Sequence, residues 1–257
     1  MARVALVTGA ARGIGAATVT ALVADGWRVV AVDRGADDPD VPYPLGTRAE
    51  LDALASDVVV TAVADTRDAA ALANAVAAAE ARWGGLDAAI AVAGVIAGGV
   101  PAWELPLEQE RAVLDIDLGG VLTLARVAVP ALLRRPSPRR GRFVAVASAA
   151  ATRGLPMLAA YCAAKAGVTG FVRALAVELR GTGITANAVS PGSTSTAILD
   201  ESARLYALPD VQAFAAQQPL ERLLRPDEVA AAIAFLVGNG GSGITGAVVP
   251  VDGGLSV

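Results

Sequence analysis

Residues 3–17 read RVALVTGAARGIGAA and predict a strand, a tight turn and the start of a helix. The run at 3–8 is short and apolar, as in a buried strand, and an alanine-rich helical stretch continues to about Asp25. The glycines let the backbone approach a ligand closely, and a helix N-terminus presents free N–H groups and a positive dipole end. The stretch therefore predicts a pyrophosphate site, and the alternative is a glycine-rich turn that serves only helix packing.

A second strand, 28–32, ends in an acidic residue, Asp33. A carboxylate at that place accepts both ribose hydroxyls of NAD and repels the 2′-phosphate of NADP. Strand, glycines, helix, strand and acid in this order are more specific than the glycines alone. They predict a dinucleotide site that prefers NAD, although the nearby cations Arg12 and Arg34 would soften that preference.

The rest of the chain alternates apolar strand-like runs with helical stretches, which is typical of a doubly wound parallel α/β sheet. We expect a single Rossmann-fold domain over 1–257 with about seven strands, because no Pro-, Gly- or Ser-rich linker divides the chain. Further strands are predicted at 58–63, 86–92, 142–147, 184–189 and 247–251, and helices at 67–82, 108–135 and 226–237, with one more that carries Tyr161 and ends near Arg180.

Two segments are longer than a crossover connection requires. The insert at about 34–57 is rich in Pro and Asp in its first half and predicts a short helix at 48–55. It leaves the sheet at the ribose end, so it either covers the cofactor or is a solvated surface loop. The segment at about 193–218 has scattered apolar residues without regular structure, and we interpret it as a substrate lid or as an amphipathic helical excursion.

Tyr161 and Lys165 stand four positions apart on a predicted helix, so their side chains share one face. Lys165 is the only lysine in a chain whose other basic residues are all arginine. A compact ammonium beside a phenol favours the phenolate and lowers the pKa of the tyrosine. Ser148 follows the strand at 142–147 and reaches the same carboxyl edge of the sheet, where ligands of open parallel sheets bind. An ordinary helical Tyr–Lys pair is the structural alternative.

Composition excludes several classes of protein. The chain has no histidine and one cysteine, Cys162, which rules out histidine-based triads and an intramolecular disulfide, and we expect no metal site. A net charge of -4 argues against nucleic acid, and we interpret the basic cluster 134–142 as a solvated loop. We expect no membrane association and a cytoplasmic location, because no apolar stretch of membrane-spanning length is free of charge and residues 3–9 already form a strand.

These motifs resemble the short-chain dehydrogenases/reductases over essentially the whole chain. The matching pieces are TGAARGIG at 8–15, Asp33, Ser148, YCAAK at 161–165, NAVSPG at 187–192 and the terminal TGAVVPVDGG. The resemblance implies a tetramer and reversible hydride transfer between a secondary alcohol or its carbonyl and NAD. Tyr161 would be the acid and base, Ser148 would bind the substrate oxygen, and Lys165 would lower the tyrosine pKa and hold the nicotinamide ribose.

The same resemblance assigns the cofactor contacts. Asp65 is expected at the adenine, although it is equally placed to cap the helix at 67–82. Pro191, Gly192 and Thr196 match the segment at the carboxamide end. The full expected set is Gly9, Arg12, Gly13, Ile14, Gly15, Asp33, Arg34, Asp65, Ala93, Gly94, Tyr161, Lys165, Pro191, Gly192, Thr194 and Thr196.

Two departures from the family pattern concern the centre of the site. The family's NNAG is AVAG at 91–94, which removes asparagine contacts that stabilise the sheet. Asp117 stands where the family has an asparagine of the catalytic set. Its carboxylate near Lys165 would raise the pKa of Tyr161. We expect weaker alcohol oxidation near neutrality or an alkaline optimum.

The insert, together with GLDAAIAVAGVIAGG at 85–99, resembles the mycofactocin-associated branch of the family. That likeness implies that NAD stays bound and is reoxidised in place by mycofactocin, a peptide-derived carrier. The leading interpretation is an NAD-dependent oxidoreductase for a hydrophobic secondary alcohol or ketone. The competing one is a dinucleotide-binding sensor or scaffold protein with weakened catalysis, for which Asp117 is the main support.

Overall fold

A seven-stranded parallel sheet forms the centre of the computed structural model, which describes residues 2–257. Its strand order is β3-β2-β1-β4-β5-β6-β7, so the doubly wound sheet predicted from sequence is confirmed. β1, β4, β5 and β6 are buried along their whole length, which explains their continuous apolar runs. The strands are β1 (Val4–Thr8), β2 (Arg28–Asp33), β3 (Val59–Val63), β4 (Ala88–Ala91), β5 (Arg142–Val146), β6 (Thr185–Pro191) and β7 (Val248–Val251).

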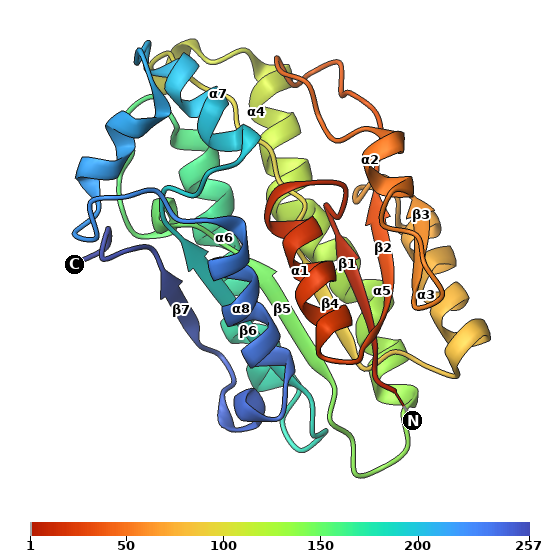
Figure 1. Cartoon of the computed structure of the whole chain (residues 1–257). Coiled ribbons are helices and arrows are strands. Elements are labelled where there is room, and N and C mark those ends of the chain that lie inside the picture. The colour runs from red at the N-terminus through yellow and green to blue at the C-terminus, as the bar shows by residue number, and fades with distance from the viewer. Residues whose placement is uncertain (1) are drawn as a thin grey trace.

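Helices cover both faces of the sheet. Figure 1 shows α1 and α8 in front of it and α5 and α6 behind it. Each face has its own apolar core: Leu22 and Ile233 lie in one, and Leu72, Leu124 and Val172 lie in the other. The α-helices are α1 (Gly13–Ala24), α2 (Arg48–Asp52), α3 (Ala69–Trp83), α4 (Leu107–Leu114), α5 (Gly120–Arg134), α6 (Ala159–Glu178), α7 (Ala197–Leu205) and α8 (Pro226–Val237). Short 3-10 helices are η1 (Ala102–Glu104), η3 (Ala149–Ala151), η4 (Val211–Gln217) and η5 (Gly240–Gly243).

The strand order reverses between β1 and β4, and this switch point creates a crevice at the carboxyl ends of the strands. Gly9, just after β1, has a φ of +65°, and a Cβ there would lie 2.6 Å from the Cα of Ala93 after β4. Only glycine lets the two loops approach this closely. The crevice therefore lies beside the glycine turn after β1, as the sequence predicts.

The helix predicted at 108–135 is interrupted. A π-helical segment, η2 (Asp115–Gly119), separates α4 from α5. Such a bulge admits an extra residue to a turn, and here it carries Ile116 and Asp117 into the interior. The predicted long helical stretch is therefore present over 107–134, but periodicity alone did not reveal the π-helical segment within it.

The segment at 193–218 is more regular than expected. It contains the helix α7 and the 3-10 helix η4, which pack together through Leu199, Ala203 and Phe214. In Figure 1, α7 and α2 lie beyond the same end of the sheet. Both excursions therefore stand over the crevice.

The stretch 107–134 is long and apolar enough to cross a membrane by length and composition alone. Half of its most apolar window is buried inside the protein, and Leu124 and Leu132 pack into the core against the sheet. Its packing against the sheet makes this stretch part of the core of the fold.

Candidate active site

A cavity of about 820 Å³ occupies the crevice and continues beneath α7. All sixteen residues predicted to contact the cofactor line it, as does Ser148. Asp117 was also predicted to belong to the catalytic set, but it does not line the cavity. Its side chain is fully buried behind Lys165. Asp117 is therefore a positioning residue rather than one that touches the reactants.

The glycine turn and Asp33 form the part of the cavity suited to a dinucleotide. One oxygen of Asp33 accepts the Ala11 N–H at 3.0 Å and the other accepts the Gly35 N–H at 3.1 Å, so the carboxylate is fixed at the mouth of the turn. Helix α1 begins beside it with no side chain capping its N-terminus. Its first N–H groups are thus available to a phosphate, and the residues present fit NAD.

The two cations expected to weaken the NAD preference are both engaged by the insert. The Arg12 guanidinium donates to the Pro44 carbonyl at 2.6 Å. Arg34 pairs with Asp38, whose side chain is only 1% exposed. Neither guanidinium is therefore free to neutralise the 2′-phosphate of NADP, and this favours NAD.

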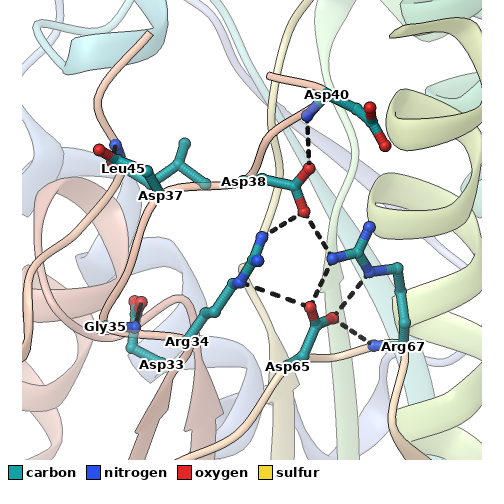
Figure 2. Close-up of polar contacts among 9 residues, drawn as sticks. All are labelled: Asp33, Arg34, Gly35, Asp37, Asp38, Asp40, Leu45, Asp65 and Arg67. Carbon is teal, nitrogen blue, oxygen red and sulfur yellow. Dashed lines mark hydrogen bonds and ion pairs between the residues drawn. The ribbon is translucent and has the colours of Figure 1, made fainter. Parts of the chain in front are cut away.

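Asp38 is the centre of a four-residue charge network drawn in Figure 2. Besides Arg34 it accepts from Arg67 at 2.5 Å, and Arg67 also pairs with Asp65 at 2.5 Å. Arg34 completes the ring, 3.7 Å from Asp65. Burial by itself raises the pKa of Asp38, but the Asp40 N–H and the Arg67 guanidinium outweigh it and hold the pKa below its ordinary value. The network ties the insert to the start of α3.

Asp65 lines the cavity as predicted, but its alternative role as a helix cap is wrong. The cap of α3 is Asp68, whose carboxylate accepts the N–H groups of Ala70 and Ala71. Asp65 instead accepts from the backbone and side chain of Arg67. Helix α3 begins two residues later than the prediction, and this displaces the capping position from Asp65.

Tyr161 and Lys165 lie on one face of α6, as their spacing predicts, and both are buried. The Lys165 ammonium stands 5.5 Å from the centre of the Tyr161 ring and 3.1 Å from the Asp117 carboxylate. It also donates to the Val146 carbonyl at the end of β5 at 3.3 Å. Ser148 follows β5, and its hydroxyl accepts the Ala150 N–H at 3.1 Å, which orients it at the edge of the cavity.

Several effects compete for the protonation of Tyr161. Burial raises the pKa of the phenol, Lys165 lowers it, and Asp117 raises it again, so that the net pKa lies above the ordinary value of 10.0. The Ser148 hydroxyl acts in the same direction as Lys165. Burial by itself lowers the pKa of Lys165, but the Asp117 carboxylate outweighs this and keeps the ammonium charged. The pKa of Asp117 is itself raised by burial, against the opposing pull of Lys165.

Comparison with known proteins decides the family. A family model described as enoyl-(acyl carrier protein) reductase matches residues 9–256. A cis-4-hydroxycyclohexanecarboxylate dehydrogenase of Sinomonas cyclohexanicum is 41% identical over 99% of this chain and 96% of that protein. The chain belongs to the short-chain dehydrogenase/reductase family. It is thus an oxidoreductase by family.

Two further comparisons extend the likeness of this short-chain dehydrogenase. A (-)-trans-carveol dehydrogenase of Rhodococcus erythropolis is 34% identical over 99% of this chain and 98% of that protein. The crystal structure of carveol dehydrogenase from Mycobacterium avium in complex with NAD superposes with a TM-score of 0.92 at 31% identity. That superposition covers 98% of this chain and 97% of the other.

The loop after β4 is stabilised without the family's asparagines. The Thr8 hydroxyl accepts the N–H of Val92 at 3.2 Å and of Ala93 at 3.4 Å, and one Asp117 oxygen accepts the Val95 N–H at 2.7 Å. In this short-chain dehydrogenase a hydroxyl and a carboxylate therefore hold the loop. The loss of stabilisation expected from AVAG is partly offset.

Sequence reasoning missed Tyr43 and Asp38. Both lie in the insert, which was described only as a possible cover, and both are buried. Tyr43 lines the cavity and belongs to the same apolar cluster as Tyr161. The signal that could have identified it is the alternation VPYPL at 41–45, in which every second residue is apolar and large.

Proposed function

We propose that this enzyme interconverts a small, largely apolar secondary alcohol and its ketone, with NAD as cofactor and Tyr161 as acid and base. The observation that carries the proposal is the convergence of Ser148, Tyr161 and Lys165 on one cavity. One end of that cavity fits a dinucleotide and the other end is apolar. The charged and hydroxyl groups stand between the two ends, where a reacting alcohol must lie.

The chemistry divides among these residues in a simple way. NAD, when bound, supplies the hydride acceptor for alcohol oxidation. Tyr161, as phenolate, takes the hydroxyl proton of the alcohol, and in the reverse direction it returns a proton to the carbonyl oxygen. Ser148 donates a hydrogen bond to the same oxygen. Lys165 favours the phenolate and is the residue suited to hold the nicotinamide ribose.

A cyclic alcohol is the substrate class that we favour. The relatives named above act on carveol and on cis-4-hydroxycyclohexanecarboxylate, according to their names. The substrate end of the cavity has a mostly hydrocarbon wall, which suits a compact ring. Its apolar lining residues are Ile96, Leu155, Leu158, Ile198, Leu199, Leu208 and Phe214. Arg153 also lines the cavity, so a ring that bears a carboxylate is included in the test below.

Reoxidation of bound NAD by mycofactocin is the finer proposal. It is supported by the insert, which is held over the cleft by Arg12 and by the charge network around Asp38. A cofactor held in this way exchanges slowly, and an external carrier must then restore NAD in place.

A homotetramer in the cytoplasm is also proposed. Exposed apolar side chains at Val177 and Phe235 support association, which size-exclusion chromatography with light scattering measures.

The competing function is a dinucleotide-binding sensor or scaffold. The specific observation in its favour is the Asp117 carboxylate, which pairs with Lys165 and opposes ionisation of Tyr161. On that interpretation the protein retains NAD but oxidises no alcohol.

One experiment separates these functions. The purified protein is extracted to measure nicotinamide per chain, and reduction is then followed by absorbance with neutral cyclic, carboxylated cyclic and straight-chain secondary alcohols. Steady turnover with added NAD indicates an ordinary dehydrogenase. A single reduction of retained NAD, without turnover of free NAD, supports the carrier-coupled enzyme. Absence of reduction with every alcohol, at neutral and alkaline pH, would refute the proposal and favour the sensor.

A further inference from the structure

The segment 41–46, here called the strap, borders the cleft, and Tyr43, Leu45 and Gly46 line the cavity. Its side chains alternate: Val41 and Tyr43 are buried, whereas Pro42 and Pro44 are exposed. The Pro44 carbonyl accepts from Arg12 of the glycine turn. A Cβ on Gly46 would lie 2.8 Å from the Ala11 side chain, so this end of the strap rests directly on the turn. The strap thus runs from the glycine turn toward the loop after β4.

Tyr43 is the point at which the strap meets that loop. Its phenol oxygen accepts the Ile96 N–H at 3.2 Å, next to the Val95 N–H held by Asp117. Two consecutive amides of the cavity wall are therefore fixed, one by the insert and one by the π-helical segment. The Tyr43 side chain lies between these amides and the open cavity, which it lines.

The hydroxyl hydrogen of Tyr43 has no acceptor among the residues that the structure describes. Within residues 2–257 the phenol takes part in one hydrogen bond, and in that bond it is the acceptor. The residue is only 8% exposed, and burial raises the pKa of the phenol, so the hydrogen stays in place. A buried donor without a partner is unfavourable, which points to an acceptor on a ligand in the cavity.

The surroundings of Tyr43 indicate which part of a ligand it meets. The next residue, Pro44, accepts from Arg12 of the glycine turn, whereas the Tyr43 oxygen itself accepts from Ile96, next to the Val95 amide that Asp117 holds. The phenol therefore stands between the adenosine end and the catalytic end. Within a bound dinucleotide, the acceptors at that place are the pyrophosphate oxygens and the hydroxyls of the second ribose.

We propose that Tyr43 donates its hydroxyl hydrogen to an oxygen in the middle of the bound dinucleotide. The strap is then a binding element that recognises the cofactor directly, and not only a cover. The inference rests on the proposed NAD site but not on the identity of the alcohol. Tyr43 also holds the Ile96 amide, so cofactor binding and the shape of the cavity wall are coupled through one side chain.

The test compares Y43F with Y206F, a matched loss of one hydroxyl. The Tyr206 hydroxyl donates to the Pro156 carbonyl at 2.7 Å, so its hydrogen is already satisfied by the protein. NADH dissociation is measured by displacement with excess NAD, and melting temperatures are measured with and without NADH. We expect Y43F to release NADH about tenfold faster and to lose part of the stabilisation that NADH confers, whereas Y206F keeps both.

Fragments of the cofactor locate the contact. If the acceptor is the pyrophosphate, Y43F weakens both ADP and ADP-ribose; if it is the second ribose, only ADP-ribose is weakened. AMP, which lacks both groups, should bind the two proteins equally.

The proposal is overturned if Y43F lowers the melting temperature equally with and without NADH and leaves NADH release unchanged. That result would assign the phenol to holding the Ile96 loop alone. Y161F keeps the two inferences distinguishable, since it should lower kcat for alcohol oxidation by about 10²- to 10⁴-fold while leaving the Tyr43 hydroxyl in place. If Y161F keeps the kcat of the unaltered protein, the proposed reaction fails, whatever Y43F does.

Discussion

The Lys165 ammonium lies 3.1 Å from the Asp117 carboxylate, and neither side chain is more than 4% exposed. This ion pair lies directly behind Tyr161, and its carboxylate cancels part of the field that the phenol experiences. The pKa of Tyr161 is consequently raised, by burial first and then by Asp117, although Lys165 opposes both. Tyr161, the proposed acid and base, is thus set for an alkaline range unless bound NAD adds positive charge.

D117N should move alcohol oxidation to lower pH. Oxidation needs the phenolate, so its rate rises with pH through the Tyr161 pKa, and loss of the neighbouring carboxylate lowers that pKa. The rising limb of the kcat/KM profile against pH should therefore shift toward acid. An identical profile in the two proteins would show that Asp117 does not act on Tyr161 through its charge.

Y161F should reduce kcat by about 10²- to 10⁴-fold, the usual contribution of a general acid and base. The ring remains, so packing in the buried cluster around Tyr161 and NADH binding should persist. Stopped-flow reduction and NADH titration measure the two properties on the same sample. Equal losses of binding and turnover would contradict a purely chemical role.

G94A should disturb the position of the Lys165 side chain. A Cβ at position 94 would lie 3.1 Å from the Lys165 ammonium and 3.3 Å from Asp117. We expect kcat/KM to fall by about tenfold, since a displaced lysine loses its alignment. The control is G170A on α6, where an added Cβ meets nothing within 4 Å. That variant should keep activity and gain about 0.5–1 kcal/mol of stability from helix propensity. Equal activity in both variants would refute the argument.

D33N should relax the choice between NAD and NADP. The amide can still accept the Ala11 N–H, but the charge that repels a 2′-phosphate is gone. The ratio of kcat/KM for NAD over NADP should fall by about 10²-fold, equivalent to about 2.7 kcal/mol. An unchanged ratio would show that Asp33 does not set the preference for NAD over NADP, and Arg34 would then be the next residue to test.

D38N should loosen the insert. Its carboxylate binds two arginines, each about one-third exposed, so the loss should cost about 1–3 kcal/mol of the free energy of unfolding. D40N is the control, because Asp40 joins the network only through its backbone N–H. Urea unfolding and protease cleavage within 34–47 are the measurements. Equal stability of the two variants would show that the network does not hold the insert.

The pH dependence of the same network has a defined sign. The pKa of Asp38 is depressed in the folded protein, against the raising effect of burial. Its contribution to stability is therefore complete above the ordinary value of 3.8 and is lost as pH falls below it. The stability difference between D38N and the unaltered protein should be constant from neutral pH down to about 5 and should shrink in stronger acid. A difference that shrinks already near neutrality would contradict this assignment.

The sequence by itself determined the fold and most of the site. Apolar runs of strand length, alternating with helical stretches, define a parallel sheet because its strands are buried on both faces. Gly9 and Asp33 were recognisable because their roles depend on the backbone and on one local charge. Tyr161 and Lys165 were paired correctly because four residues on a helix are neighbours whatever surrounds them.

Tertiary structure alone decided how those groups are tuned. The π-helical segment that turns Asp117 toward Lys165 depends on one extra residue in a turn, which periodicity does not register. Asp38 and Tyr43 acquire their roles only when the insert folds back over residues far away in the chain, Arg67 and Ile96. Burial and through-space charge set the pKa of a group and the partner of a hydrogen bond. Neither is encoded by spacing along the chain, because both depend on segments that meet only in the folded protein.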